Sequence, residues 1–211
     1  MTTPSAAPDL LVIGAMRAGT AALQGLLDTH PDIAMSGRSP SAPLRGAASA
    51  GWTDPADPGA AARIASTAPD VRLVMLVRDP LERALSHWRH RVREGSEERP
   101  APRALPDPAS PYVARSRYHE ALAPYRASFD DAQLLVVVLE RLRAEPAREL
   151  ARVLRHVGAD PARGPEPRRT RVPAPAGPTL DAGTRAAFAD AVRDDATALR
   201  AWLGDDLPEW A

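Results

Sequence analysis

The sequence predicts an α/β protein in which a parallel sheet is flanked by helices, in three layers. Short, continuously apolar runs are typical of parallel strands buried on both faces. Three runs of this kind occur, at residues 10–13, 71–77 (where Arg72 is the one polar residue) and 134–139. Each is followed by a segment whose apolar residues recur at helical spacing. Strands that alternate with helices form parallel sheets with right-handed crossovers. We therefore expect ligands to bind at the carboxyl edge of this sheet.

Further elements are expected along the chain, and the whole of 1–211 is expected to form a single domain, since a chain of this length buries one core. A turn precedes a short strand at 33–35, and helices are predicted at 60–68, 80–92, 116–129, 146–157 and 181–203. Residues 1–9 are predicted to be a flexible N-terminus, 36–60 a loop with at most one short strand, and the proline-rich segments 99–111 and 161–178 loops.

Composition excludes several classes of function. The 27 basic and 27 acidic residues balance, so no global positive field exists to attract nucleic acid. Cysteine is absent, which excludes thiolate nucleophiles and cysteine–zinc sites. No apolar run has the length of a signal peptide core or a membrane span, so we expect no membrane partner and a cytoplasmic location. All basic residues are arginine, and any cation in a site must therefore be a guanidinium or an imidazolium.

A glycine-containing loop after the first strand is the first candidate site. Gly14 and Gly19 lie between strand 10–13 and a helix that begins near Thr20. Backbone N–H groups in such a loop, together with the helix dipole, favour an anion, and Arg17 adds a fixed cation. The loop resembles a phosphate-binding loop in outline. It departs from the nucleoside-triphosphatase pattern, in which lysine directly follows the second glycine.

A second cation follows the second predicted strand. Arg78 comes directly after strand 71–77, and Asp79 and Pro80 suit the N-cap and first position of the next helix. Since the carboxyl ends of parallel strands share one edge of the sheet, Arg78 and Arg17 are expected to lie at the same edge. An ion pair of Arg78 with Asp79 or Glu82 is the alternative.

Two motifs resemble those of sulfotransferases that use 3′-phosphoadenosine 5′-phosphosulfate as sulfuryl donor. Ile13–Thr20 (IGAMRAGT) resembles the family's 5′-phosphosulfate loop, and Leu76–His87 (LVRDPLERALSH) resembles its 3′-phosphate motif. The arginine and serine of the second motif, eight residues apart, match Arg78 and Ser86. Residues 116–125, 134–142 and 203–210 resemble bacterial members. The resemblance implies a fold similar to that of P-loop nucleoside triphosphatases, the adenylyl phosphosulfate as co-substrate, and no metal.

The resemblance also implies which residues bind the donor. They are Arg17, Ala18, Gly19, Thr20, Ala21, Ala22, Arg78, Ser86, Arg168, Arg169 and Arg171, with Arg17 also catalytic as a charge next to the departing phosphate oxygen. For Ser86 the alternative is a helical serine bonded back to the preceding turn. For the arginines of 168–171 the alternative is a solvated run of charge.

The acceptor side departs from the family pattern. Relatives usually have a Lys-Glu-x-His segment after the second strand, where this chain has Arg38–Ser41. A glutamate usually lies on the next strand, where the best local match, Gly46–Ser49, has alanine. The interval 36–69, which should hold part of the acceptor pocket, is contracted.

Two histidines are candidates for the group that takes the acceptor proton. His87 and His90 lie on the helix after Arg78, and an imidazole titrates near neutrality, as a general base should. The alternative is that both are surface or helix-packing residues. Asp54 and Asp57 in the contracted interval are weaker candidates.

The sequence thus leads to the hypothesis of a sulfotransferase that acts on a hydroxyl or amine of a small-molecule or glycan acceptor. A weakly active or inactive relative that still binds the nucleotide is the first alternative. A P-loop kinase is the second, against which stand the missing lysine and the lack of an acidic residue at a strand end to bind magnesium.

Overall fold

The computed structural model describes residues 7–35, 42–164 and 180–210. Its centre is a five-stranded sheet in the order β2-β3-β1-β4-β5, in which every pairing is parallel. The strands are β1 (Leu10–Gly14), β2 (Ile33–Met35), β3 (Leu44–Ala48), β4 (Arg72–Val77) and β5 (Leu134–Val138). The predicted α/β class with a parallel sheet is confirmed.

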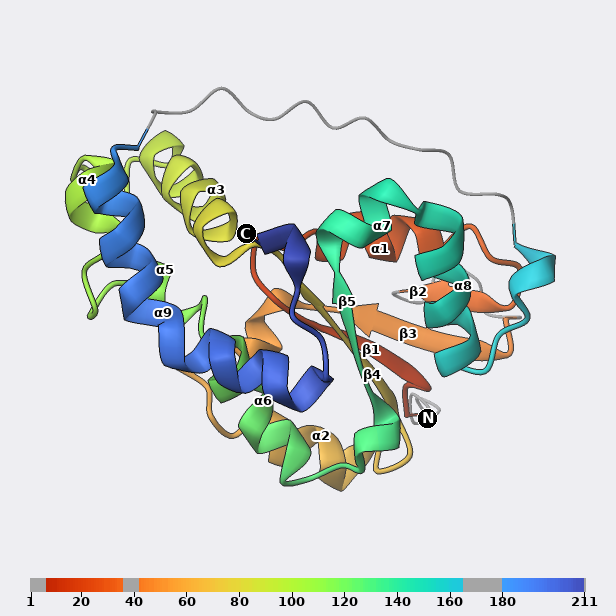
Figure 1. Ribbon diagram of the computed structural model, residues 1–211. Helices are drawn as coiled ribbons and strands as arrows, with labels where there is room; N and C mark the ends of the chain where they lie inside the picture. Colours follow the sequence, from red (N-terminus) through yellow and green to blue (C-terminus); the bar gives the residue numbers. More distant parts are fainter. Residues whose placement is uncertain (1–6, 36–41, 165–179, 211) are drawn as a thin grey trace.

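Helices cover both faces of the sheet and its carboxyl edge (Figure 1). One face carries α1 (Thr20–Leu27), α7 (Leu139–Ala144) and α8 (Pro146–His156); the other carries α2 (Ala60–Thr67) and α6 (Tyr118–Arg126). At the carboxyl edge lie α3 (Pro80–Arg93), α4 (Ala101–Ala104), α5 (Pro111–Ala114) and the long α9 (Ala182–Leu203). Short 3₁₀ turns are η1 (Ala50–Thr53), η2 (Asp131–Gln133), η3 (Pro161–Arg163) and η4 (Pro208–Trp210).

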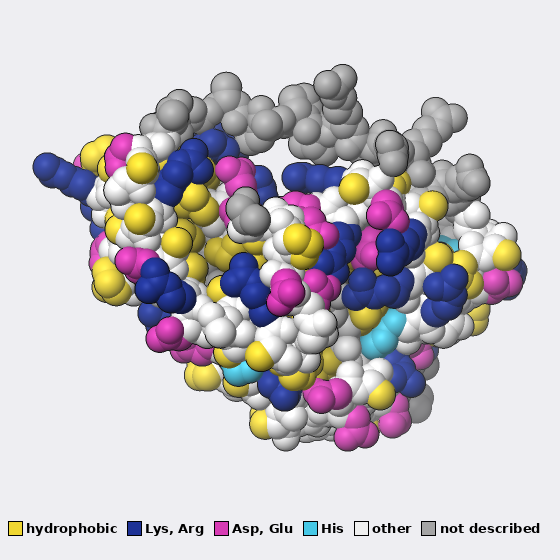
Figure 2. Space-filling view, viewed as in Figure 1, with side chains coloured by type: hydrophobic (Ala, Val, Ile, Leu, Met, Phe, Trp, Pro, Cys, Tyr) yellow, Lys and Arg dark blue, Asp and Glu magenta, His cyan; other side chains and the backbone are white. Residues whose placement is uncertain are grey.

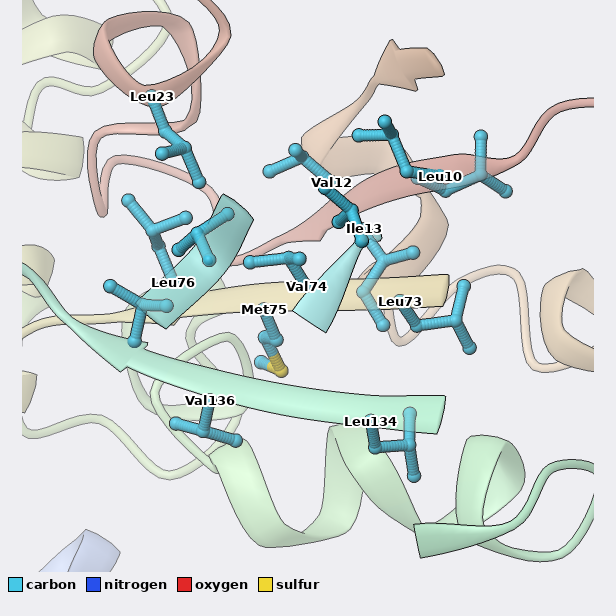
Figure 3. Packing of buried hydrophobic residues seen from close by; sticks show 14 of the residues in the cluster. Leu10, Val12, Ile13, Leu23, Leu73, Val74, Met75, Leu76, Leu134 and Val136 are labelled. Atoms are coloured by element: carbon cyan, nitrogen blue, oxygen red, sulfur yellow. The ribbon is translucent and has the colours of Figure 1, made fainter. Parts of the chain in front are cut away.

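The apolar strand runs form the main core. Leu10, Ile13 and Leu73 are completely buried. Figure 3 shows strand side chains packing above and below the sheet, with Leu23 of α1 on one side. A second cluster lies outside the sheet, where α3, α4, α5 and α9 enclose residues such as Tyr112 and Phe188. The carboxyl edge of the sheet is therefore bordered by a separately packed group of helices.

Several local expectations need correction. Predicted loop 99–111 contains α4, because prolines at the first positions of a helix are compatible with it. The third strand ends at Val138 rather than at 139, and α7 follows at once. The described part of 36–60 contains β3 and η1. Val92 does not continue the buried face of α3, since it lies in the last turn and is 41% exposed.

The C-terminal segment closes onto the start of α7. Arg141 forms ion pairs with Asp205 and Glu209. The indole N–H of Trp210 donates to Glu140, which in turn accepts the backbone N–H of Asp79 at 3.1 Å. The tail therefore helps to fix the end of β4, where one of the predicted anion clamps begins. No helix in 7–35, 42–164 or 180–210 has the length and apolar character needed to cross a membrane.

Candidate anion-binding site

The loop after β1 is held closely by its neighbours. A β-carbon added to Gly14 would lie 2.1 Å from the hydroxyl oxygen of Thr53, so only glycine fits there. Gly19 has φ 98° and faces Leu139, to which an added β-carbon would come within 2.9 Å. Arg17 also has a left-handed backbone, with φ 66°. The lack of room for a β-carbon at Gly14 and Gly19 explains why the sequence has glycine at both ends of the loop.

The N-terminus of α1 offers backbone donors to an anion. Its N-cap, Gly19, has no side chain to cap the first turn. The N–H groups of Ala18 and Ala22 are already bonded to Ala15 and Gly19 carbonyls, at 3.0 and 2.9 Å. Among the described residues no backbone carbonyl accepts from the N–H groups of Gly19, Thr20 and Ala21. A helix N-terminus with free donors is the local arrangement that binds phosphate.

The end of β4 holds the residues of the second predicted anion clamp. Asp79 caps α3 by accepting the N–H of Glu82 at 2.7 Å, and Pro80 is the first helical residue, as predicted. Arg78 is 7% exposed. One of its terminal nitrogens donates to Glu82 at 3.0 Å, so the alternative ion pair does form. Its Nε is buried without a partner in the described part of the chain, so this donor is available to a ligand.

The two predicted motifs meet through Arg17 and Ser86. The Nε of Arg17 donates to the Ser86 hydroxyl at 3.2 Å, across 69 positions of sequence. The Ser86 hydroxyl is therefore directed at the loop. Burial lowers the pKa of Arg17, and the nearby charges of Arg93 and Arg78 lower it further. The electrostatic potential at Arg17 is thus raised by neighbouring arginines, and an anion bound there would relieve the repulsion among them.

Arg83 is a residue of this site that we did not single out from the sequence. It is completely buried, and its guanidinium donates to the Ser116 hydroxyl at 2.9 Å and to the Tyr112 carbonyl at 2.7 Å. A third donor reaches the Met16 carbonyl of the loop at 3.4 Å. Burial lowers its pKa to about 10, so it remains charged at neutral pH. The sequence feature that could have indicated its burial is that Arg83 directly precedes two apolar residues of the helix, Ala84 and Leu85.

The two candidate histidines have different surroundings. His87 is 6% exposed, its ring lies edge-on to that of Tyr112 with centroids 5.0 Å apart, and its Nδ1 has no partner among the described residues. Burial, with a contribution from Arg83, lowers the pKa of His87 to about 3, so the ring is neutral at pH 7. His90 is half-exposed and lies 3.2 Å from Glu94.

The remaining predicted residues are more distant or undescribed. Asp54, beside Thr53, forms an ion pair with Arg115, whereas Asp57 pairs with Arg63 on the surface. Ala47 lies on β3, opposite Leu11 of β1. The segment Arg38–Ser41 and the donor-site candidates Arg168, Arg169 and Arg171 fall outside the residues that the structure describes.

Comparison of the sequence with known proteins gives consistent results. The profile of the sulfotransferase family matches residues 41–162, a range that includes Arg78 and Ser86. Two mouse proteins, heparan sulfate glucosamine 3-O-sulfotransferases 3B1 and 3A1, are each 28% identical, over 179 and 182 residues. Each match covers 72% of this chain and 46% of the mouse protein, so the chain spans about half the length of these relatives.

The fold also matches solved structures. The sulfotransferase from Alicyclobacillus acidocaldarius aligns with a TM-score of 0.80 at 20% identity, over 96% of this chain and 98% of that one. The sulfotransferase domain from the curacin biosynthetic pathway aligns with a TM-score of 0.54 at 11% identity, over 74% of this chain and 75% of that one. At such identities the likeness shows the fold alone. The family match extends over more than half of the sequence, and the chain therefore belongs to the sulfotransferase family.

Proposed function

We propose that the protein transfers a sulfuryl group from 3′-phosphoadenosine 5′-phosphosulfate to an acceptor. The contact between Arg17 and Ser86 is the observation that carries this proposal, because it joins the two motifs that resemble donor clamps. A donor with a phosphosulfate at one end and a separate phosphate at the other needs two neighbouring anion sites. The buried, unpartnered Nε of Arg78 fits such a ligand, since a buried donor is costly to leave without a bond.

In this proposal each clamp has its own donors. The N–H groups of Gly19, Thr20 and Ala21 and the guanidinium of Arg17 would bind the phosphosulfate. Arg78 would bind the 3′-phosphate through its fork of N–H groups, with Ser86 beside it. No metal-binding residue is needed, because fixed guanidinium and backbone dipoles supply the positive charge. Arg168, Arg169 and Arg171 remain predicted donor ligands.

The acceptor is proposed to be a hydroxyl or amine of a small molecule or glycan. The mouse relatives are named for the 3-O position of a heparan sulfate glucosamine, which supports an acceptor of the glycan kind. His87 is the proposed proton acceptor, with a neutral ring and a free Nδ1. A pKa of about 3 makes it a weak base, so it would act late, as the acceptor becomes acidic on forming the new bond.

Nucleotide binding without transfer is the second candidate, and the acceptor side favours it. The stretch Gly46–Ser49, the best local match to the family's glutamate segment, has alanine instead, and Asp54, the carboxylate next to Thr53, is engaged by Arg115. A P-loop kinase is disfavoured because Thr20, not lysine, follows Gly19. All three candidates bind a nucleotide, and ligand specificity separates the kinase from the other two.

Thermal unfolding with nucleotides is the first test. A ligand that binds only the native state raises the unfolding temperature. We expect 3′-phosphoadenosine 5′-phosphate to stabilise the protein without magnesium, and ATP with magnesium to have little effect. Adenosine 5′-phosphate, which lacks the 3′ group, serves as the matched control. Stronger stabilisation by ATP with magnesium would reject the sulfotransferase proposal in favour of a kinase.

The 3′-phosphate clamp is tested by Arg78→Ala. Binding of the 3′,5′-bisphosphate should weaken by about 1.5–3 kcal/mol, the range for hydrogen bonds to charged groups. Affinity for adenosine 5′-phosphate should hardly change. Both are measured by titration calorimetry. Glu82 loses its ion pair in this variant, but it is half-exposed and can be solvated. Equal losses for the two ligands would show that Arg78 has only a structural role.

A further inference from the structure

One face of α3 carries a row of polar residues that continues past the proposed donor site. Residues four, seven and eleven positions after Glu82 share its side of a helix with 3.6 residues per turn. These positions are Ser86, Arg89 and Arg93. The row therefore begins at the partner of Arg78 and ends in two arginines that the proposed function does not use.

The row faces the glycine loop. Ser86, its second member, accepts the Arg17 hydrogen bond. Arg93, its last member, is near enough for its charge to lower the pKa of Arg17, after the effect of burial. Figure 2 shows basic and acidic side chains together around the hollow between the helices at the carboxyl edge and the α7 side of the molecule. Arg93, the last residue of α3, thus adds to the positive charge around the loop.

Within the described ranges, no hydrogen-bond or ion-pair partner of these two guanidinium groups is seen. Both Nε and Nη1 of Arg89 are buried, and no acceptor for them exists in the part of the chain that is described. Arg93 is exposed and forms no ion pair there. The carboxylates of α3 and its C-cap are already engaged, Glu82 by Arg78 and Glu94 by His90. Buried guanidinium donors without an acceptor are costly, which points to a ligand that supplies one.

The direction of the row indicates which ligand this is. In the proposed function the 3′-phosphate lies at Arg78 and Ser86, and the phosphosulfate lies at Arg17, whose guanidinium contacts Ser86 from the loop. Arg89 and Arg93 lie about 4.5 and 10.5 Å beyond Ser86 along the helix axis, away from Arg78, at a rise of 1.5 Å per residue. Past the phosphosulfate end of the donor lies the space from which the acceptor must approach.

We propose, on the basis of the proposed function, that Arg89 and Arg93 bind an anionic group of the acceptor. The acceptor is then an acidic compound, with a carboxylate or sulfate about one to two helical turns from the hydroxyl or amine that receives the sulfuryl group. Planar guanidinium groups match the paired oxygens of such anions. Neutral acceptors of the same shape would leave the Arg89 donors without a partner.

The test compares pairs of acceptors that differ only in charge. One pair is 4-hydroxyphenylacetate and 4-hydroxyphenylethanol. The other is a tetrasaccharide of alternating glucuronate and N-acetylglucosamine, with its carboxyl-reduced form. Each is titrated at low salt into protein saturated with 3′-phosphoadenosine 5′-phosphate, so that the donor clamps are filled. The variant is Arg89→Gln with Arg93→Gln. Its control, with the same charge change, is Arg103→Gln with Arg155→Gln, exposed arginines of α4 and α8.

The proposal makes a definite prediction for the ratio of affinities. In the wild type and the control, the acidic member of at least one pair should bind at least about tenfold more tightly than the neutral one, as expected for charge-assisted bonds. The Arg89/Arg93 variant should bring that ratio close to one while leaving bisphosphate affinity within about twofold. If the ratio changes only for the phenol pair, the acceptor is a small acid; if it changes only for the tetrasaccharide pair, the acceptor is an acidic glycan.

Three results would overturn the proposal. A ratio that stays the same in the variant would show that other groups recognise the acid. A bisphosphate affinity that falls as much as the acid affinity would place both arginines in the donor site. Bisphosphate binding with no preference for either acid in the wild type would exclude an acidic acceptor of these kinds. Failure to bind bisphosphate at all would instead reject the proposed function, and it is measured in the same titrations.

Discussion

Arg17→Ala is expected to lower turnover at least about a hundredfold, the scale of losing one preorganised donor. In sulfuryl transfer negative charge builds on the departing phosphate oxygen, so a fixed cation beside it favours the transition state over the bound ground state. A guanidinium supplies charge and hydrogen bonds but is a poor proton donor. We therefore expect Arg17 to act as a charge clamp, and its loss to affect turnover more than product binding.

The design of this test uses the geometry of the loop. Arg17 has φ 66°, and alanine has the same β-carbon, so the strain of a left-handed residue is the same in Arg17→Ala and the wild type. Arg17→Lys should keep measurable activity, because the charge remains although the bond to Ser86 is lost. The assay is transfer of labelled sulfate to a panel of phenols, sugars and amines, with Arg155→Ala on α8 as control. Donor binding with no transfer in wild type or any variant would favour the inactive relative.

The strands were predictable because burial on both faces leaves a continuous apolar run. Leu10–Ile13 can be recognised without knowledge of its neighbours. β3 has the sequence LRGAA, which shows no such run, because it is only partly buried. Its place next to β1 depends on a glycine, Gly46, which admits Leu10 and Met35 where an added β-carbon would lie within 3 Å of each. Such a strand is determined by tertiary packing rather than by local pattern.

The site could be predicted in part for a similar reason. Arg17 and Arg78 directly follow strands, and the topology of a parallel sheet brings strand ends together. Ser86 was suggested by its spacing in a motif, and its contact with Arg17 could be known only from the structure. Arg83 and Arg89 were not found, because a helical arginine reads as a solvated residue unless its burial is known. The sequence pattern does not reveal which guanidinium N–H donors lack a hydrogen-bond partner in the folded protein.

Arg83→Met is expected to lower the free energy of unfolding by about 2–4 kcal/mol, because it leaves buried acceptors without donors. Arg83 joins three segments, the loop through Met16, α5 through Tyr112, and the chain after α5 through Ser116. Methionine fills a similar volume without polar atoms. The substitution also has a stabilising effect, because the variant no longer has a charged group to desolvate on folding.

The balance still favours a loss of stability, because the two buried acceptors, at Ser116 and Tyr112, cost about 1–3 kcal/mol each when left unpaired. The Met16 contact, at 3.4 Å, is the weakest, so Tyr112 and Ser116 contribute most. Urea unfolding gives the total. Hydrogen exchange should also show faster opening of the glycine loop than of α8, which Arg83 does not touch. Arg83→Lys keeps the charge but not the three-way fork, and should lie between the wild type and Arg83→Met. A loss below about 1 kcal/mol for Arg83→Met, with loop exchange unchanged, would show that the recovered desolvation outweighs the three bonds and that Arg83 does not hold the loop.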